Sequence, residues 1–293
     1  MDYLVKALAL QNQVRVYLVK NKDIVNETIR RHDLWPSASS ALGKVMSVGL
    51  MMGAMLKNDE ALTIKLNGNG PIGNIIVDAN GTGTVRGYVD NPHINFVGKN
   101  GLDDSFAIGN SGLLEVIKDL KLKDFFTSTI ETTGNVASDF TYYFMESEQT
   151  PSAVYLGILI DVDNKCRTSG GMIFQLLPGT SDETITKLEE CLKRIDSVST
   201  LIENCSLEEI LELLFEEDFE VLETKNVKFE CTCSKENFAR GLITLGVKDL
   251  EELLHEEKEI KTTCHYCCEQ YSFNESEIEK LIEEAKKKWT KNF

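Results

Sequence analysis

Four cysteines near the C-terminal end of the chain have the residue type and spacing that suit a metal ion. They form two close pairs, Cys231-Thr232-Cys233 and Cys264-His265-Tyr266-Cys267, separated by thirty residues. Two thiolates from each of two tight turns can surround one Zn²⁺ in a tetrahedron with Zn–S bonds of about 2.3 Å. A region this small builds little apolar core, so a bound metal would contribute folding free energy. We therefore predict one zinc ion per chain, held by Cys231, Cys233, Cys264 and Cys267.

The same four thiolates are compatible with two roles. On spacing alone, a purely structural zinc ribbon is favoured. Three features favour a redox switch instead. All four ligands are cysteines and can be oxidised, each close pair can form a disulfide once the metal is lost, and an acidic segment of marginal stability precedes the site.

The other thiols and the neighbouring histidine are less informative. Cys268 directly follows the second pair, where a spare ligand, a resolving thiol and a small buried residue are all compatible with the sequence. His265 is read as an ordinary turn residue because four cysteines already complete the site. Isolated cysteines are most often small buried hydrophobic residues, which is what we expect of Cys166, Cys191 and Cys205.

The elements around the cysteines are predicted to form a zinc-binding domain over residues 227–293. Ser234 can cap a helix that Gly246 ends, and a second helix is expected over residues 250–254. Asn274 and Glu277 mark the start of a last helix that reaches about Lys288.

Residues 1–179 are predicted to form an α+β domain. Val14, Val16 and Leu18 alternate as in a strand. Helices are expected over residues 26–32, 37–57 and 113–120. Strands are expected within residues 62–89, with a hairpin at Asn80-Gly81, and at residues 138–144, 155–160 and 171–177.

Residues 180–226 are predicted to form an acidic helical linker segment. Ser181 can cap one helix, and Ser206 with Glu209 forms a capping-box pattern before another. The segment has little apolar mass of its own, so we expect it to pack on another part of the chain.

Charge and hydropathy exclude several partners. Of the net charge of −16, residues 1–180 carry −3 and residues 181–293 carry −13. Such a surface repels phosphate backbones, so nucleic acid is not an expected partner. The apolar stretch Val45–Leu56 is too short to span a membrane, and the N-terminus lacks a basic lead and a cleavable apolar run. We therefore expect a cytoplasmic protein, in which thiols remain reduced.

Two other patterns have ordinary explanations. The run from Gly68 to Gly73 fits the dinucleotide-binding pattern G-x-G-x-x-G, but Ile75-Ile76-Val77 predicts a following strand where that motif needs a helix. Met46, Met51, Met52 and Met55 could offer an adaptable face for binding other proteins, although a packed core helix is the favoured interpretation.

At the cysteine motif the chain resembles the redox-regulated 33 kDa chaperonin family of bacterial heat-shock holdases. The family pattern appears as Cys231-Thr232-Cys233-Ser234 and Cys264-His265-Tyr266-Cys267, and the resemblance covers nearly the whole chain. Further similar blocks are Leu245-Gly246, Tyr271-Ser272-Phe273, Gly68-Asn69-Gly70-Pro71, Arg86-Gly87-Tyr88 and the run from Gly170 to Gly179. The extra thiol of Cys268 departs from the family pattern and puts a clean two-disulfide product in doubt.

The resemblance implies an ATP-independent chaperone that is inactive while reduced and zinc-bound. Oxidation would form the disulfides Cys231–Cys233 and Cys264–Cys267 and release zinc. The linker would then unfold and expose apolar surface to unfolding client proteins. Activated members dimerise, hold their clients without ATP and pass them to ATP-dependent refolding chaperones.

Two rival functions follow from the residues. The first is a thiol-disulfide oxidoreductase that uses Cys264 and Cys267; against it, this pair does not open a helix after a strand, and a second pair shares its ligand role. The second is a zinc-ribbon nucleic-acid module; against it, residues 231–293 hold 10 basic and 13 acidic side chains. No catalytic Ser/His/Asp or paired-carboxylate pattern stands out, so an enzyme is not expected.

Overall fold

The computed structural model describes residues 1–98, 101–102, 104–256 and 259–290. The chain divides into two compact units, Met1–Glu230 and Cys231–Phe293. The segment 180–226 thus packs within the first unit.

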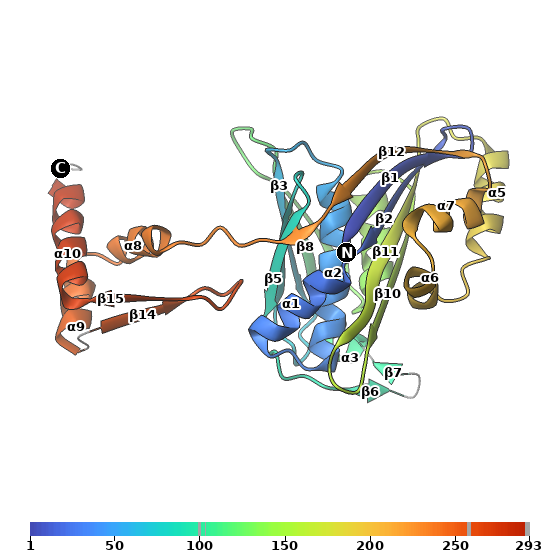
Figure 1. The fold of residues 1–293 in the computed structure, drawn as a ribbon. Coiled ribbons are helices and arrows are strands. Elements are labelled where there is room, and N and C mark those ends of the chain that lie inside the picture. The colour runs from blue at the N-terminus through green and yellow to red at the C-terminus, as the bar shows by residue number, and fades with distance from the viewer. Residues whose placement is uncertain (99–100, 103, 257–258, 291–293) are drawn as a thin grey trace. The chain divides into compact units, whose positions relative to one another are not determined.

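The first unit contains two large β-sheets (Figure 1). One is antiparallel with the strand order β10-β11-β2-β1-β12. Its strands are β1 (Tyr3–Ala9), β2 (Val14–Lys20), β10 (Ser152–Ile160), β11 (Cys166–Leu176) and β12 (Phe219–Asn226). The other has the order β13-β5-β4-β3-β8-β9, and only β13 pairs in parallel. Its strands are β3 (Ala61–Asn67), β4 (Ile75–Asn80), β5 (Thr84–Val89), β8 (Gly112–Asp119), β9 (Phe126–Thr132) and β13 (Lys228–Phe229).

Helix α2 (Pro36–Gly53) lies between the two sheets (Figure 1). Every residue of this helix except Pro36 and Lys44 is buried. A side chain at Gly53 would approach the carbonyl oxygen of Asn80 to 2.7 Å, so the strand can pack closely only against glycine there. Met46, Met51 and Met52 are buried in this core, which confirms that they belong to a packed helix.

Smaller elements complete this unit. They are α1 (Lys22–His32), the strand pair β6 (Val97–Gly98) and β7 (Gly101–Leu102), α3 (Asp104–Ile108) and α4 (Val136–Glu146). The hairpin predicted at Asn80-Gly81 is confirmed, because β4 ends at Asn80 and pairs with β5. The element after Gly73 is strand β4, so the glycine-rich run lacks the helix that a dinucleotide site needs.

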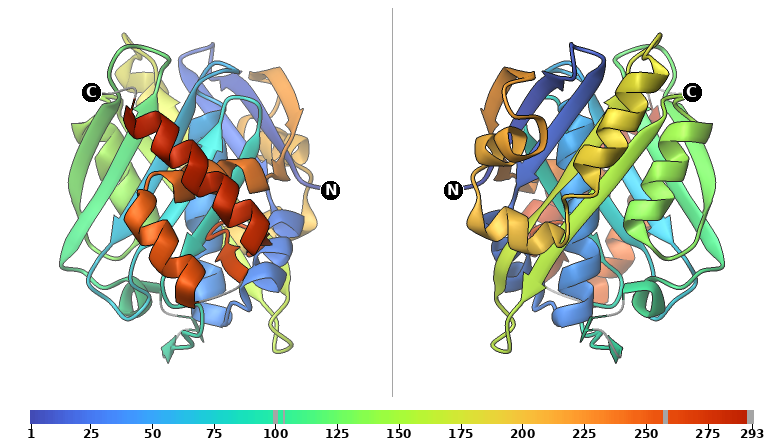
Figure 2. Two further views of the ribbon diagram at one scale, coloured as in Figure 1. Left: turned by 90° about the vertical axis from the view of Figure 1, so that its left-hand side faces the viewer. Right: turned by 90° about the vertical axis from the view of Figure 1, so that its right-hand side faces the viewer.

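Three helices cover the outer face of the first sheet: α5 (Asp182–Leu192), α6 (Val198–Asn204) and α7 (Leu207–Phe215) (Figure 2, right). Val14, Val16 and Leu18 of β2 point to this side, as their alternation predicts, and join a second apolar core. Leu207, Ile210, Leu211 and Leu214 of α7 are buried in that core. The helices depend on the sheet for their apolar contacts.

The linker prediction needs one correction. Residues 181–215 are largely helical, and both expected caps are present. The Ser181 side chain accepts a hydrogen bond from Thr184 N, and the Ser206 side chain accepts one from Glu209 N. Residues 219–226, however, form strand β12, which pairs with β1 about 200 positions earlier. That non-local partner is not visible in the local sequence pattern.

Two further secondary-structure predictions were wrong. Residues 113–120 lie mostly in strand β8, where Leu114 and Val116 alternate toward the core. Residues 138–144 lie in helix α4. The Asn135 side chain caps this helix by accepting a hydrogen bond from Ser138 N, and Phe140 and Phe144 share one buried face. The aromatic residues of α4 favour strands by propensity, but burial of one helical face decides.

The second unit consists of α8 (Lys235–Ile243), α9 (Val247–Glu256), the hairpin β14 (Glu259–Thr263) and β15 (Gln270–Asn274), and α10 (Glu275–Thr290). Its small core contains Leu250, Ile260, Phe273, Ile278 and Ala285, among others. The predicted caps at Ser234 and Asn274 are present, and Gly246 has a φ of 98° after α8.

None of the helices in the described part of the chain is long and apolar enough to cross a lipid bilayer.

Candidate metal centre

The fold of the second unit brings the four predicted cysteines together. Cys231 and Cys233 precede α8, whereas Cys264 and Cys267 lie in the turn between β14 and β15. All four sulfur atoms lie within 4.8 Å of one another. Two distances cross between the pairs: 3.7 Å from Cys231 Sγ to Cys264 Sγ, and 3.3 Å from Cys233 Sγ to Cys267 Sγ.

The sulfur positions fit a tetrahedral zinc ion. Four sulfurs at Zn–S distances of about 2.3 Å are about 3.8 Å apart, close to the Cys231–Cys264 distance. All eight cysteines are free thiols in this structure. An all-thiolate donor set is one that zinc prefers.

A tight turn positions the second pair. The amide of Cys268 donates to the carbonyl of Cys264 over 2.9 Å, and the amide of Cys264 donates to Glu269 over the same distance. Backbone N–H groups of Tyr266 and Cys267 also donate to the sulfur of Cys264. Hydrogen bonds of this kind stabilise thiolates in a fixed geometry.

Burial opposes those hydrogen bonds. Cys264 and Cys267 are each only 5% exposed. This burial raises the pKa of both thiols above the usual range, while the N–H donors act in the opposite direction. A bound cation would favour the thiolate forms of these two buried groups.

The first pair is held by the start of α8. Ser234 Oγ accepts a hydrogen bond from Asn237 N, and the Asn237 side chain donates to the carbonyl of Thr232 over 3.1 Å. Lys235 forms an ion pair with Glu277 at 2.6 Å, which joins α8 to α10. The turn that carries Cys231 and Cys233 is thus fixed to the helices of the second unit.

The remaining cysteines lie outside the cluster. Cys166 and Cys191 are buried, as expected of small hydrophobic residues, whereas Cys205 is half-buried. Burial raises the pKa of Cys166 to about 12, so its thiol is unreactive at neutral pH. His265 is exposed in the turn and does not belong to the sulfur cluster.

Sequence reasoning missed one residue of this site. The Tyr271 hydroxyl lies 3.3 Å from Cys233 Sγ and 3.2 Å from the Cys233 carbonyl oxygen. The hydrogen bond with Cys233 raises the pKa of the tyrosine. The available signal was an aromatic residue four positions after Cys267, on the strand that leaves the turn.

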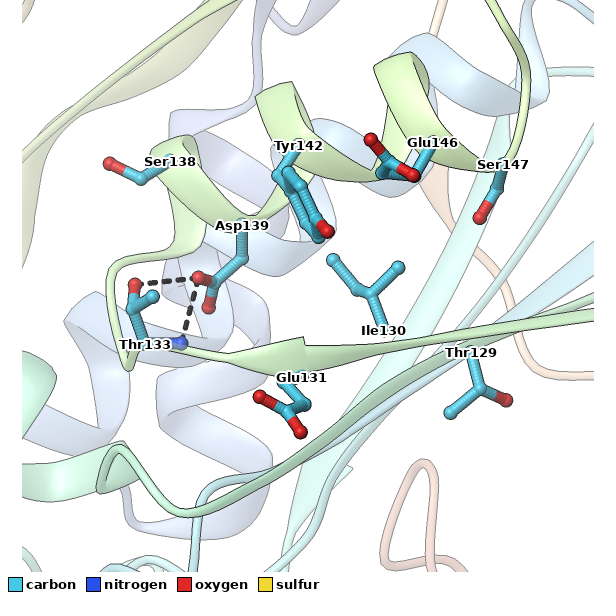
Figure 3. A pocket seen from close by; sticks show the side chains of 9 residues that line it. All are labelled: Thr129, Ile130, Glu131, Thr133, Ser138, Asp139, Tyr142, Glu146 and Ser147. Carbon is cyan, nitrogen blue, oxygen red and sulfur yellow. Dashed lines mark hydrogen bonds between the residues drawn. The ribbon is translucent and has the colours of Figure 1, made fainter.

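The first unit has a polar surface pocket of about 590 Å³ between β9 and α4 (Figure 3). Its buried carboxylate, Asp139, accepts hydrogen bonds from Thr133 N at 2.9 Å and Thr133 Oγ1 at 2.6 Å (Figure 3). Asp139 also accepts a hydrogen bond from Thr132 Oγ1. The carboxylate thus fixes the turn before α4, and the pocket lining contains neither histidine nor cysteine. This arrangement is structural.

The fold and the four-thiol cluster define a class: a two-unit protein whose C-terminal unit carries four clustered cysteines that could hold a metal ion. The family model described as Hsp33 protein matches residues 2–274. The chain is 48% identical over 288 residues to a 33 kDa chaperonin of Bacillus licheniformis, covering 97% of this chain and 100% of that one. It is 49% identical over 291 residues to a 33 kDa chaperonin of Geobacillus kaustophilus, covering 98% and 99%.

A solved structure has the same fold. The crystal structure of the 33 kDa chaperonin of Thermotoga maritima matches with a TM-score of 0.89 and 31% identity, over 96% of this chain and 97% of that one. The chain belongs to the Hsp33 family of heat-shock chaperones. The resemblance stated from the sequence is confirmed.

Proposed function

We propose that this chain is a redox-regulated, ATP-independent holdase of the cytoplasm. The observation that carries the proposal is the cluster of four sulfur atoms within 4.8 Å of one another. Reduced and zinc-bound, the protein is inactive. Oxidation of the cluster switches on binding of unfolding client proteins.

When bound, zinc supplies the positive charge that keeps four buried or half-buried sulfurs deprotonated. The residues that would hold it are Cys231, Cys233, Cys264 and Cys267. They join the turn before α8 to the β14–β15 turn, and the small core of this unit depends on that connection.

The redox step converts the thiolate pairs to the disulfides Cys231–Cys233 and Cys264–Cys267. For each pair, two sulfurs lose two electrons to a peroxide and an S–S bond forms. The O–O bond breaks, and its oxygens leave as two waters after taking up protons. The chain then lacks the thiolates on which metal retention depends.

After oxidation of the cluster, the segment that unfolds is residues 180–226. Its helices α5, α6 and α7 bury their apolar side chains against one sheet face. Burial of each such leucine or isoleucine contributes about 2 kcal/mol, so these helices are stable only while packed. Unpacking would expose Val16, Leu18 and Phe174 of the sheet to clients, while the acidic residues keep the opened form soluble.

Partners follow from this mechanism. Exposed apolar surface fits unfolding client chains and, in the oxidised state, a second copy of the chain. Clients held without ATP are then refolded by ATP-dependent chaperones. The charge of −16 argues against nucleic acid as a partner.

The test measures zinc content and suppression of aggregation on the same samples. We expect about one zinc per reduced chain. Peroxide with mild heat should release this zinc and switch on protection of a heated client protein. A Cys205→Ser variant, altered outside the cluster, should respond like the unmodified chain. Zinc release without protection from aggregation would contradict the holdase function.

A further inference from the structure

Tyr271 connects the two halves of the sulfur cluster. It belongs to β15, in the hairpin that carries Cys264 and Cys267, yet its hydroxyl contacts Cys233 of the other half. The oxygen lies 3.3 Å from Cys233 Sγ and 3.2 Å from the carbonyl oxygen of the same residue. The two cysteine pairs are therefore joined by a side-chain contact that does not involve a metal ion.

The position of the tyrosine ring is fixed on several sides. In the hairpin, Tyr271 lies opposite Thr262, whose hydroxyl donates to the Tyr271 carbonyl over 3.2 Å. The ring packs against Phe238 of α8 with centroids 5.2 Å apart. Because strand pairing and ring packing hold the side chain, the hydroxyl remains near Cys233 without an added entropic cost.

The hydroxyl has a single hydrogen to donate. The Cys233 sulfur and the Cys233 carbonyl oxygen both lie within reach of this hydrogen. A sulfur that serves as a metal ligand can only accept it. The contact thus fixes the position of a sulfur that the proposed zinc site uses as a ligand.

The two pairs obtain their hydrogen-bond donors differently. Cys264 receives N–H groups of its own turn, from Tyr266 and Cys267, and Cys267 receives that of Glu269. The Cys233 sulfur instead contacts the hydroxyl of a side chain on strand β15. A donor on a side chain can be removed by a single substitution that leaves the backbone unchanged.

We propose that Tyr271 is a positioning residue whose hydroxyl holds the Cys233 sulfur in place as a ligand and restrains its reaction with oxidants and other electrophiles. This inference rests on the proposed zinc switch and adds a residue that sets how readily the switch opens. The hydroxyl group, and not only the ring, is required.

The test compares the full-length reduced chain with its Tyr271→Phe variant, which keeps the ring and removes the hydroxyl. We expect zinc loss to a chromogenic chelator to be about tenfold faster in the variant. Alkylation followed by peptide mass spectrometry should show Cys233 reacting faster, with Cys166 unchanged. With Co²⁺ in place of zinc, the sulfur-to-metal charge-transfer band should move to longer wavelength, because the sulfur electrons are less stabilised.

Two further variants separate the hydroxyl from the ring. Tyr155→Phe removes a tyrosine hydroxyl in the first unit and should leave zinc loss, alkylation and the cobalt spectrum unchanged. Tyr271→Leu should lose zinc at least as fast as Tyr271→Phe. If Tyr271→Phe matches the unmodified chain and only Tyr271→Leu differs, the ring alone acts and the proposal is overturned.

The outcome is independent of the holdase function. An unmodified reduced chain without zinc would overturn the proposed switch itself. A zinc-bound chain whose Tyr271→Phe variant has the same chelator, alkylation and cobalt behaviour would overturn only the role of Tyr271.

Discussion

At the scale of single residues, Cys268 shows how one position serves both backbone geometry and thiol chemistry. Its φ of 59° lies in the left-handed region, where a side chain costs about 1 kcal/mol or more. Its amide closes the turn by donating to Cys264. The turn therefore needs a backbone that glycine adopts without strain, whereas the chain places a fifth thiol there.

We predict that Cys268→Gly retains zinc and stabilises the second unit by about 0.5 kcal/mol, because strain relief exceeds the added freedom of the unfolded chain. Thermal unfolding followed by circular dichroism would measure the stability. After peroxide treatment, disulfide mapping should find fewer pairings than in the unmodified chain. Loss of zinc from the variant would instead identify Cys268 as a ligand.

At the scale of elements, helix α7 begins with a complete capping box. Ser206 Oγ accepts from Glu209 N over 3.1 Å, and Glu209 Oε2 accepts from Ser206 N over 2.6 Å. The cap lies at the start of the helix that contributes Leu207, Ile210 and Leu214 to the apolar core between helices α5–α7 and the first sheet. Its strength should influence how easily this segment unpacks.

We predict that Ser206→Ala destabilises α7 by about 1 kcal/mol, since an amide of the first turn loses its acceptor. Amide hydrogen exchange over residues 207–215 should become roughly five times faster. If α7 unpacks during activation, milder heat should then suffice for client protection after oxidation. Ser234→Ala removes a comparable cap in the second unit, so it serves as the control and should leave exchange in residues 207–215 unchanged.

At the scale of the whole molecule, the first cysteine of the cluster lies two residues after the last strand of the first unit. Strand β12 pairs with β1, and β13 pairs with β5 immediately before Glu230 and Cys231. One continuous stretch thus contributes edge strands to both large sheets and then enters the four-cysteine cluster. Coupling between the centre and residues 181–226 has a direct covalent route.

We predict that Cys264→Ser weakens zinc retention and increases proteolysis within residues 181–226, because a three-thiolate site holds the second unit less firmly. Limited proteolysis with mapping of the cleavage sites would detect the change. Cys205→Ser should leave both zinc content and the cleavage pattern unaltered. An unchanged cleavage pattern in Cys264→Ser, despite lost zinc, would argue against coupling to this segment.

Features that depend on short spacing could be predicted from the amino-acid sequence alone. The two close cysteine pairs, the caps at Ser181, Ser206 and Ser234, and the Asn80-Gly81 hairpin all follow from residues a few positions apart. The motif that the two pairs form predicts that their four sulfurs meet, as they do. Local geometry decides these features, because the interacting groups are chain neighbours or share a motif with a known preference.

Features that depend on distant partners could be found only in the folded chain. Residues 113–120 are mostly strand, residues 138–144 are helical, and residues 219–226 pair with β1. Tyr271 likewise reaches Cys233, 38 positions away, only because β15 and α8 fix its ring. In each case burial and pairing with remote residues outweigh local propensities of a few tenths of a kcal/mol, and those partners exist only once the chain has folded.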